Sequence, residues 1–333
     1  MQRNKRFCLC ALAAVLSLFL CGTALSAPKT MRIGTIMSLE HPHQKALEKL
    51  AELVKEKTNG ELEVKIFPMS QLGGGNTQVQ NVKLGTQEAY IDSVGWYPDL
   101  VGEYALFGTP YALSCEEIDR ALDGPIGDAL NNDLLKRHGI RMLSVNWDRA
   151  PRHVLSIRPI LSVADVKGLK LRIPPVPHLV VPWKMLGASP TPVNFGEVYL
   201  ALQQKIVEAV ELPFDMIYTM KFHEGAKNLS LTSHTCDNAG FSVNERWYKS
   251  LTPAQAKALN EAVREAGILN NRLSVELDTV FRNKMEAEGV KFYTVDVNAF
   301  RQAARDAPKQ LEAQGLWRKG FYESVLESLR RPN

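Results

Sequence analysis

The 333-residue sequence contains none of the short motifs that mark common catalytic sites. No G-x-S-x-G nucleophile motif occurs. The glycines at 73–75 are followed neither by the Lys-Ser/Thr pair of a P-loop nor by the glycine spacing of a dinucleotide site, so we interpret them as a turn. His41 and His43 lack a third metal ligand at motif spacing. We therefore expect no enzyme activity, no metal and no cofactor.

A large excess of charge is also absent. The full chain has a net charge of +4, from 40 basic and 36 acidic residues. Removing residues 1–27 takes away three basic residues and no acidic ones, which leaves a net charge of +1. A charge so close to zero gives no support for a nucleic-acid-binding surface.

The first 27 residues are typical of an export signal. Arg3, Lys5 and Arg6 precede an uncharged apolar run at 7–20, and small residues follow it. That run is shorter than the roughly 20 residues that span a bilayer, which favours a signal peptide over a membrane anchor. No second long apolar run follows, so we predict a soluble protein that is exported to the periplasm.

Few cysteines remain beyond the signal. Cys8, Cys10 and Cys21 lie within it, which leaves Cys115 and Cys236. Their spacing does not fit a zinc site. An oxidising compartment allows a disulfide between them, and two free structural thiols are the alternative.

The rest of the chain alternates strand and helix patterns. Strands are predicted at 31–37, 61–67, 89–94, 141–146, 154–156, 169–173 and 208–212, and helices at 43–58, 115–122, 127–138 and 196–206. The β-α-β start indicates an α/β protein with parallel strands. Residues 253–288 predict a single helix roughly 54 Å long, which could connect two lobes, with Gly267 as a candidate kink.

The most specific pattern lies at 165–211, which reads DVKGLKLRIPPVPHLVVPWKMLGASPTPVNFGEVYLALQQKIVEAVE. It closely resembles the substrate-binding subunits of TRAP transporters (tripartite ATP-independent periplasmic transporters), the DctP-like family. The family pattern is D-x-K-G-L-K-x-R-x-P followed by G-A-x-P-T-P-x-x-x-x-E-V-Y-x-A-L-Q. The matching residues are Asp165, Lys167, Gly168, Leu169, Lys170, Arg172, Pro174, Gly187, Ala188, Pro190, Thr191, Pro192, Glu197, Val198, Tyr199, Ala201, Leu202 and Gln203. Shorter matches at 67–74 and 221–224 extend the resemblance over nearly all of the mature chain.

The resemblance implies a two-lobed periplasmic binding protein fold of the α/β class, with a hinge and a long helix that spans both lobes. It places lobe I at 28–149 plus 238–277, and lobe II at 150–237 plus 278–333. It further implies a monomer that closes over a small organic acid and delivers it to the small and large TRAP membrane subunits. A ligand-sensing module for a signalling receptor is the alternative function.

The resemblance also assigns ligand-binding residues. The central one is Arg172, because a guanidinium offers a planar fork of donors that matches a carboxylate. Taken without the motif, it would be interpreted as a surface arginine. Arg152 matches a second ligand arginine or forms a hinge salt bridge. Phe195 matches an aromatic that packs on the ligand or is a core residue.

One departure from the family concerns the strand end that often reads Gln-Glu-Asn-Pro, which here is Val210-Glu211-Leu212-Pro213. Leu212 has no side-chain hydrogen-bonding group, which argues against a sialic-acid-type ligand. Asp215 either replaces the lost polar contact or is solvated.

Four more residues are expected at the cleft. Glu40 and His41 lie in the loop where the family's first lobe meets ligand, although Ser38 in this loop can simply cap the next helix. Ser93 and Trp96 follow a later strand, and Trp96 either stacks on a ring-shaped acid or belongs to the core. The sequence leaves open which carboxylate is bound.

Overall fold

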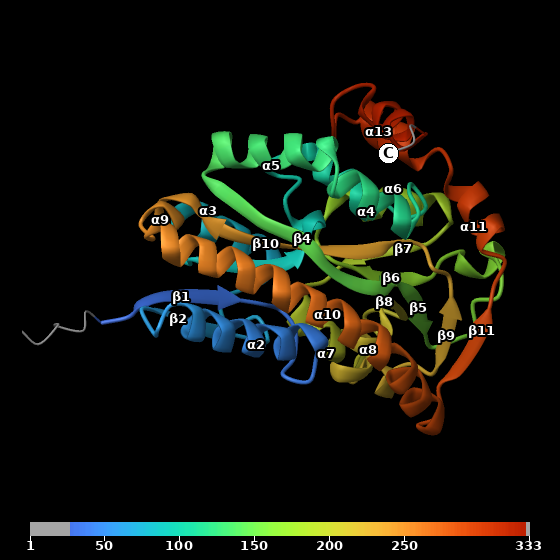
Figure 1. Cartoon of the computed structure of the whole chain (residues 1–333). Helices are drawn as coiled ribbons and strands as arrows, with labels where there is room; N and C mark the ends of the chain where they lie inside the picture. The colour runs from blue at the N-terminus through green and yellow to red at the C-terminus, as the bar shows by residue number, and fades with distance from the viewer. Residues whose placement is uncertain (1–26, 331–333) are drawn as a thin grey trace, which may run out of the picture.

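The computed structural model describes residues 27–330, so the predicted signal peptide lies outside the described residues except for Ala27. Over this range the chain forms two β-sheets with helices packed around both (Figure 1), and the predicted α/β class is confirmed. No helix in residues 27–330 combines the length and the apolar character needed to cross a membrane.

The first sheet has the strand order β2-β1-β3-β10-β4. Its strands are β1 (Lys29–Gly34), β2 (Leu62–Phe67), β3 (Ala89–Ser93), β4 (Ile140–Pro151) and β10 (Cys236–Asn244). β1 is parallel to β2 and β3, as the β-α-β start predicts, whereas β10 runs antiparallel to β3 and β4.

The second sheet has the strand order β11-β9-β5-β8-β6-β7. Its strands are β5 (His153–Ser156), β6 (Lys170–Ile173), β7 (Ser189–Pro192), β8 (Ala209–Leu212), β9 (Asn228–Leu231) and β11 (Lys291–Thr294). β6 is parallel to both of its neighbours, whereas β5 is antiparallel to β8 and β9. The carboxyl ends of β6 and β8 therefore meet at one edge of this sheet.

The α-helices are α2 (Pro42–Lys57), α3 (Gly75–Leu84), α4 (Cys115–Leu122), α5 (Pro125–His138), α6 (Pro177–Met185), α7 (Val198–Gln203), α8 (Phe214–Thr219), α9 (Glu245–Lys249), α10 (Pro253–Ala287), α11 (Val297–Ala304), α12 (Ala307–Ala313) and α13 (Phe321–Arg330). Short 3-10 helices are η1 (Val94–Trp96), η2 (Gly102–Gly108), η3 (Val163–Val166), η4 (Phe195–Glu197) and η5 (Phe222–Glu224). The cap of α2 is His41, whose Nδ1 accepts a hydrogen bond from the backbone N of His43 at 3.1 Å, so Ser38 does not provide it.

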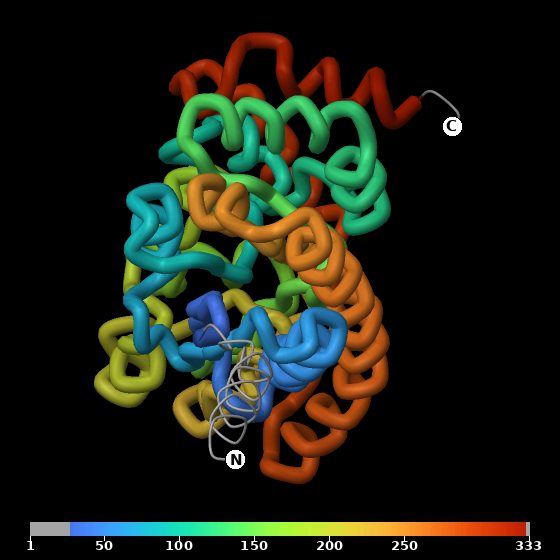
Figure 2. The backbone as a smooth tube through the Cα atoms, turned by 60° about the vertical axis from the view of Figure 1, so that its left-hand side comes forward, coloured from blue at the N-terminus to red at the C-terminus, as the bar shows by residue number. Residues whose placement is uncertain are grey.

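The long helix predicted near the C-terminal third is confirmed as α10, which runs along the molecule past both sheets (Figures 1 and 2). It begins with a capping box between Thr252 and Gln255. At Gly267 a Cβ atom would lie 2.7 Å from Oδ1 of Asn146 on β4. Glycine at this position therefore allows α10 to pack closely against the first sheet.

The chain passes between the two sheets along β4 into β5, returns from β9 into β10, and passes again along α10. The lobe boundaries expected from the sequence remain a prediction. At the end of the described chain, Phe321 and Val325 of α13 pack in the same hydrophobic cluster as Ile118 and Leu122 of α4. The C-terminal helix therefore covers helices of the first lobe (Figures 1 and 2).

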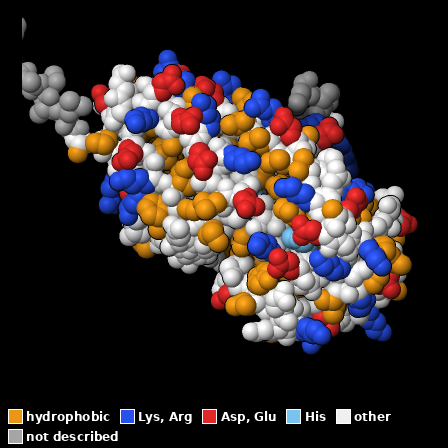
Figure 3. Space-filling model, turned by 90° about the horizontal axis from the view of Figure 1, so that it is seen from below, with side chains coloured by type: hydrophobic (Ala, Val, Ile, Leu, Met, Phe, Trp, Pro, Cys, Tyr) orange, Lys and Arg blue, Asp and Glu red, His pale blue; other side chains and the backbone are white. Residues whose placement is uncertain are grey.

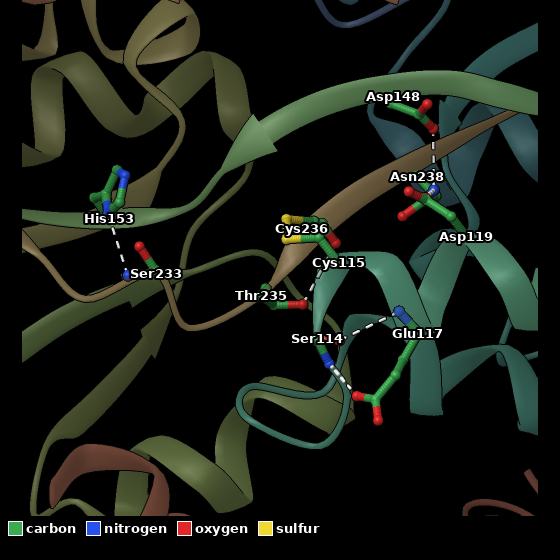
Figure 4. The surroundings of a disulfide bond; sticks show 10 residues. All are labelled: Ser114, Cys115, Glu117, Asp119, Asp148, His153, Ser233, Thr235, Cys236 and Asn238. Atoms are coloured by element: carbon green, nitrogen blue, oxygen red, sulfur yellow. Dashed lines mark hydrogen bonds between the residues drawn. A yellow bond between two sulfur atoms is a disulfide. The ribbon is translucent and has the colours of Figure 1, made fainter. Parts of the chain in front are cut away.

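A disulfide joins Cys115 and Cys236, whose Cα atoms lie 5.4 Å apart, so the two free thiols considered above are not observed (Figure 4). Cys115 begins α4, where Ser114 forms a capping box with Glu117. Cys236 begins β10. The bond therefore ties a helix of the first lobe to the strand that returns from the second sheet.

The surface view in Figure 3 shows basic and acidic side chains interspersed, with no large patch of either sign on this face. This distribution agrees with the near-neutral charge calculated for the chain without residues 1–27.

Candidate functional site

A cavity of about 40 Å³ lies between the two sheets and is partly open to solvent. Its wall includes Ile36 just after β1, Ser93 at the end of β3, Pro174 just after β6 and Leu212 at the end of β8. In α/β sheets, ligands bind outside the carboxyl ends of the strands. The cavity is therefore the candidate functional site.

Arg172 reaches this cavity from β6 and is only 1% exposed. Its Nε and Nη2 atoms donate to the backbone oxygen of Val193 at 2.9 and 2.7 Å, which fixes one edge of the guanidinium. The other edge, formed by Nη1 and the second hydrogen of Nη2, has no hydrogen-bond partner among residues 27–330. That edge has the spacing of donors that a carboxylate accepts as a bidentate pair.

The Arg172 side chain is a buried cation with no ion-paired acid in the described part of the chain. Burial lowers the pKa of Arg172 to about 9, while Glu211 opposes this shift, so the guanidinium remains charged at neutral pH. Burying an unpaired charge is costly. A bound anion would offset that cost, which makes Arg172 the natural anchor of an acidic ligand.

The Phe195 ring centroid lies 5.8 Å from Cζ of Arg172, a distance at which the cation and the ring attract each other. Phe195 lines the cavity and also packs edge-to-face on Phe222, with ring centroids 5.7 Å apart. It therefore combines the two roles considered from the sequence, as a wall of the cavity and as a residue of the second core cluster.

Arg152 lies between β4 and β5, where the chain passes from one sheet to the other. Its Nε and Nη2 atoms donate to the two carboxylate oxygens of Glu211, each at 2.7 Å, and its Nη1 donates to Oδ2 of Asp237. Burial opposes the charge on Arg152, but Asp237 and Glu211 outweigh it and raise the pKa of Arg152. The salt bridge considered from the sequence is thus formed, and the side chain also lines the cavity.

Glu211 on β8 is fully buried beneath this network. Burial alone would raise the pKa of Glu211, but Arg152 and a hydrogen bond from His234, with Nε2 at 2.9 Å, lower it to about 2. Glu211 is therefore ionised at neutral pH and holds Arg152 in one orientation.

A third arginine and two aspartates of the cavity wall were not predicted from the sequence. Arg149 on β4 pairs with Asp92 on β3, and its Nη1 lies 3.3 Å from Oδ2 of Asp237. All three line the cavity. Arg149 was visible only as a neighbour of Arg152, and Asp92 and Asp237 come from distant segments that carry no local signal.

Ser93 and Trp96 both line the cavity, as predicted. The Oγ atom of Ser93 accepts a hydrogen bond from the backbone N of Gly95 at 3.1 Å and so caps η1. A Cβ atom at Gly75 would lie 2.4 Å from the Trp96 ring, so glycine at the start of α3 makes room for the indole.

Three of the predicted ligand residues lie elsewhere. Nε2 of His41 lies 3.2 Å from Oδ2 of Asp215, both side chains are buried, and neither lines the cavity. Glu40 is exposed and is also absent from the cavity wall. We therefore carry forward Arg172, Arg152, Phe195, Ser93 and Trp96 as the candidate ligand residues.

The remaining wall is mostly apolar, with Leu212, Met216 and Leu179 among its residues. His178 on α6 also lines it, and burial lowers the pKa of His178 to about 4, so this imidazole is neutral at neutral pH. Leu212, where the sequence differs from the family pattern, thus lies in the cavity wall and makes that part of it apolar.

Comparisons with known proteins agree with this geometry. The family described as bacterial extracellular solute-binding protein, family 7 (DctP) matches residues 33–314. A solute-binding protein of Roseobacter denitrificans is 30% identical over 304 residues, which cover 90% of each chain.

Two solved structures have the same fold. A TRAP periplasmic solute-binding protein of Fusobacterium nucleatum, with bound sn-glycerol-3-phosphate, is similar with a TM-score of 0.85 and 27% identity, covering 90% of this chain and 97% of that one. One from Roseobacter denitrificans, with bound L-galactonate, gives a TM-score of 0.82 and 28% identity, covering 90% and 100%. The predicted family and the two-lobed fold are confirmed, and this chain belongs to the DctP family of bacterial extracellular solute-binding proteins of TRAP transporters.

Proposed function

We propose that this chain captures a small organic carboxylate in the periplasm and delivers it to a TRAP-type membrane permease. The observation that carries this proposal is the free edge of the Arg172 guanidinium, buried in the cavity wall with no acid paired to it among the described residues. Its relative from Roseobacter denitrificans holds L-galactonate, which is also a carboxylate.

The ligand carboxylate would accept hydrogen bonds from Nη1 and Nη2 of Arg172. The carbonyl oxygen of Val193 holds the guanidinium in place for this contact, and the Phe195 ring packs beside it. Arg152 is neutralised by Glu211 and Asp237, so its role is to shape the cavity and to offer a polar wall. No bond of the ligand is made or broken, and the ligand leaves unchanged.

Closure of the two lobes would trap the ligand and exclude water. Ile36 and Met37, which follow β1, pack in the same cluster as Phe195 and Leu212 of the second lobe. Nδ2 of Asn76 on α3 lies 3.5 Å from the backbone oxygen of Pro175, which follows β6 of the second sheet. These contacts support a hinge motion at the crossing strands, of the kind used by periplasmic binding proteins. Exclusion of water strengthens the ion pair at Arg172.

Export would depend on residues 1–27, the proposed signal peptide. The partners would be the small and large membrane subunits of a TRAP permease, and the binding protein would act as a monomer. None of the relatives described above is a sensing module, so we retain transport as the function.

A thermal-shift screen of the purified chain lacking residues 1–27 tests this proposal. A ligand that binds only the folded state raises the melting temperature. We expect at least one organic acid of a panel to raise it, and the methyl ester of the same acid to leave it unchanged. If esters stabilise the protein as well as the acids do, the carboxylate is not the recognised group and the proposal fails.

A further inference from the structure

Besides the buried Nε of Arg149, which has no partner among the described residues, two charged groups of the cavity wall offer free hydrogen-bonding positions. One is the Nη1–Nη2 edge of Arg172, described above. The other is Oδ1 of Asp237, which accepts no hydrogen bond from residues 27–330. Arg149 and Arg152 both donate to the second oxygen of this carboxylate, Oδ2. Asp237 is 6% exposed and lines the cavity.

The other carboxylates near the cavity have their oxygens occupied. Oδ1 of Asp92 accepts from Arg149 and from the backbone N of Ser93, and Oδ2 accepts from the hydroxyl of Tyr90 at 2.8 Å. Both oxygens of Glu211 accept from Arg152. Asp237 therefore provides the free carboxylate oxygen of the cavity wall in the described structure.

The negative charges around Asp237 disfavour the binding of a second anionic group. Arg149 and Arg152 supply two positive charges, whereas Asp92, Glu211 and Asp237 supply three negative ones. All five are buried. These five side chains together carry a net charge of −1, and among the described residues that line the cavity Arg172 is the arginine without an acid partner.

We propose that the ligand is a monocarboxylate that also carries a hydroxyl or amine hydrogen-bond donor, and that Asp237 selects for that donor and against a second carboxylate. This inference rests on the proposed function, because the contact of the ligand carboxylate with Arg172 sets the orientation of the ligand. The donor fills the free Oδ1 of Asp237. A second carboxylate would instead meet a buried like charge, which is strongly unfavourable.

The apolar wall agrees with a ligand of this kind. Leu212 and Met216 lie in the cavity wall and offer no charged group. They suit the carbon chain between the two polar ends of the ligand. A dicarboxylate would need a second cation, and both Arg149 and Arg152 are already paired with acids.

The test is calorimetric titration of the chain lacking residues 1–27 with matched acids of four to six carbons. Each set holds the plain monocarboxylate, its terminal hydroxyl form, its terminal amine form and the dicarboxylate, and galactonate with galactarate forms a further pair. We expect a hydroxyl or amine form to bind most tightly, and dicarboxylates to bind about 100-fold more weakly or worse. The hydroxyl and amine forms distinguish a hydroxy acid from an amino acid as the ligand.

Asp237→Asn then tests the residue itself. We expect the dicarboxylate penalty, which is the ratio of the dicarboxylate Kd to the Kd of the hydroxyl form, to shrink at least about tenfold, because the buried like charge is gone. Asp119→Asn is the matched control. Asp119 accepts a hydrogen bond from Asn238, the residue after Asp237 (Figure 4), but does not line the cavity. It should leave the ranking of ligands unchanged.

The outcomes separate the two proposals. Dicarboxylates that bind the wild-type chain as tightly as the hydroxyl and amine forms overturn the role of Asp237, whatever the variant does. An unchanged ranking in a folded Asp237→Asn variant overturns it too. If no acid of the series binds, the proposed function falls together with this inference.

Discussion

Nε2 of His41 lies 3.2 Å from Oδ2 of Asp215, and this buried pair joins the loop after β1 to the start of α8 after β8. The Nδ1 of His41 accepts from the backbone N of His43, so the ring carries its hydrogen on Nε2, facing the carboxylate. Burial raises the pKa of Asp215, but His41 and Arg149 outweigh it and lower the pKa below its usual range. The pair therefore connects an element of the first sheet to one of the second, and we expect it to stabilise the closed arrangement proposed above.

Asp215→Asn should weaken ligand binding although Asp215 itself does not line the cavity. The new amide would place a donor against the N–H of His41, while its oxygen keeps the hydrogen bond from the backbone N of Met216, now 2.7 Å long. A loss of about 1–2 kcal/mol for a disrupted contact between two buried polar groups corresponds to about a 5- to 30-fold higher Kd. Surface plasmon resonance should show most of the change in the dissociation rate.

The control for this prediction is Glu52→Gln on the exposed part of α2, where Glu52 pairs with Lys49. It should leave Kd unchanged. Equal affinities of the Asp215→Asn variant and the wild type would show that the pair does not stabilise the closed form.

Replacement of both Cys115 and Cys236 by alanine should lower the free energy of unfolding by about 2–5 kcal/mol. The bond closes a long loop between α4 and β10, and a long loop gains freedom in the unfolded chain when the bond is absent. Urea titration monitored by circular dichroism measures the loss. Reduced wild-type protein should unfold at the same urea concentration as the variant, and identical curves for oxidised and reduced wild type would contradict this account.

The raised pKa of Asp148 on β4 should make the stability of the folded protein depend on pH. Burial, with help from Asp119 and Asp123, raises the pKa of Asp148 from 3.8 to about 7. Because the folded state holds this proton more tightly than the unfolded state, its contribution to stability is present below about pH 4 and is lost as the pH rises to about 7. Asp148→Asn removes this dependence.

Melting temperatures measured between about pH 5 and pH 8 test this sign. Relative to the Asp148→Asn variant, the wild type should lose stability as the pH rises. Asp99 is exposed, so the Asp99→Asn variant should show the same change of melting temperature with pH as the wild type. A difference between wild type and Asp148→Asn that stays constant over this range would refute the assignment.

Local patterns in the sequence predicted the elements that have one apolar face. The helix predicted at 115–122 is α4, and the helix predicted at 253–288 differs from α10 by one residue at its end. β10 was missed, because every residue of Cys236–Asn244 is buried and the strand shows no alternation. Its polar side chains find partners that are far away in sequence, such as the hydroxyl of Tyr97, which donates to Ser242 at 2.8 Å.

Only the part of the candidate site that lies in or near the family pattern could be predicted from the sequence. Arg172 and Arg152 lie in or near a long family pattern, and both line the cavity. Asp237 lies on the missed strand β10, and no local pattern reveals that two arginines share its carboxylate. His41 and Asp215 were each expected at the ligand, whereas their contact with each other depends on how the two lobes meet.

The central claim concerns Arg172 and is tested most directly by titrating the chain with a ligand acid found in the thermal-shift screen. Arg172→Ala should raise Kd by about 30-fold to several-thousand-fold, because it leaves a desolvated carboxylate unpaired, at a cost of about 2–5 kcal/mol. Arg172→Lys should recover only part of the loss, since an ammonium group cannot replace the planar fork. A folded Arg172→Ala variant that binds the acid within threefold of the wild type would contradict the account.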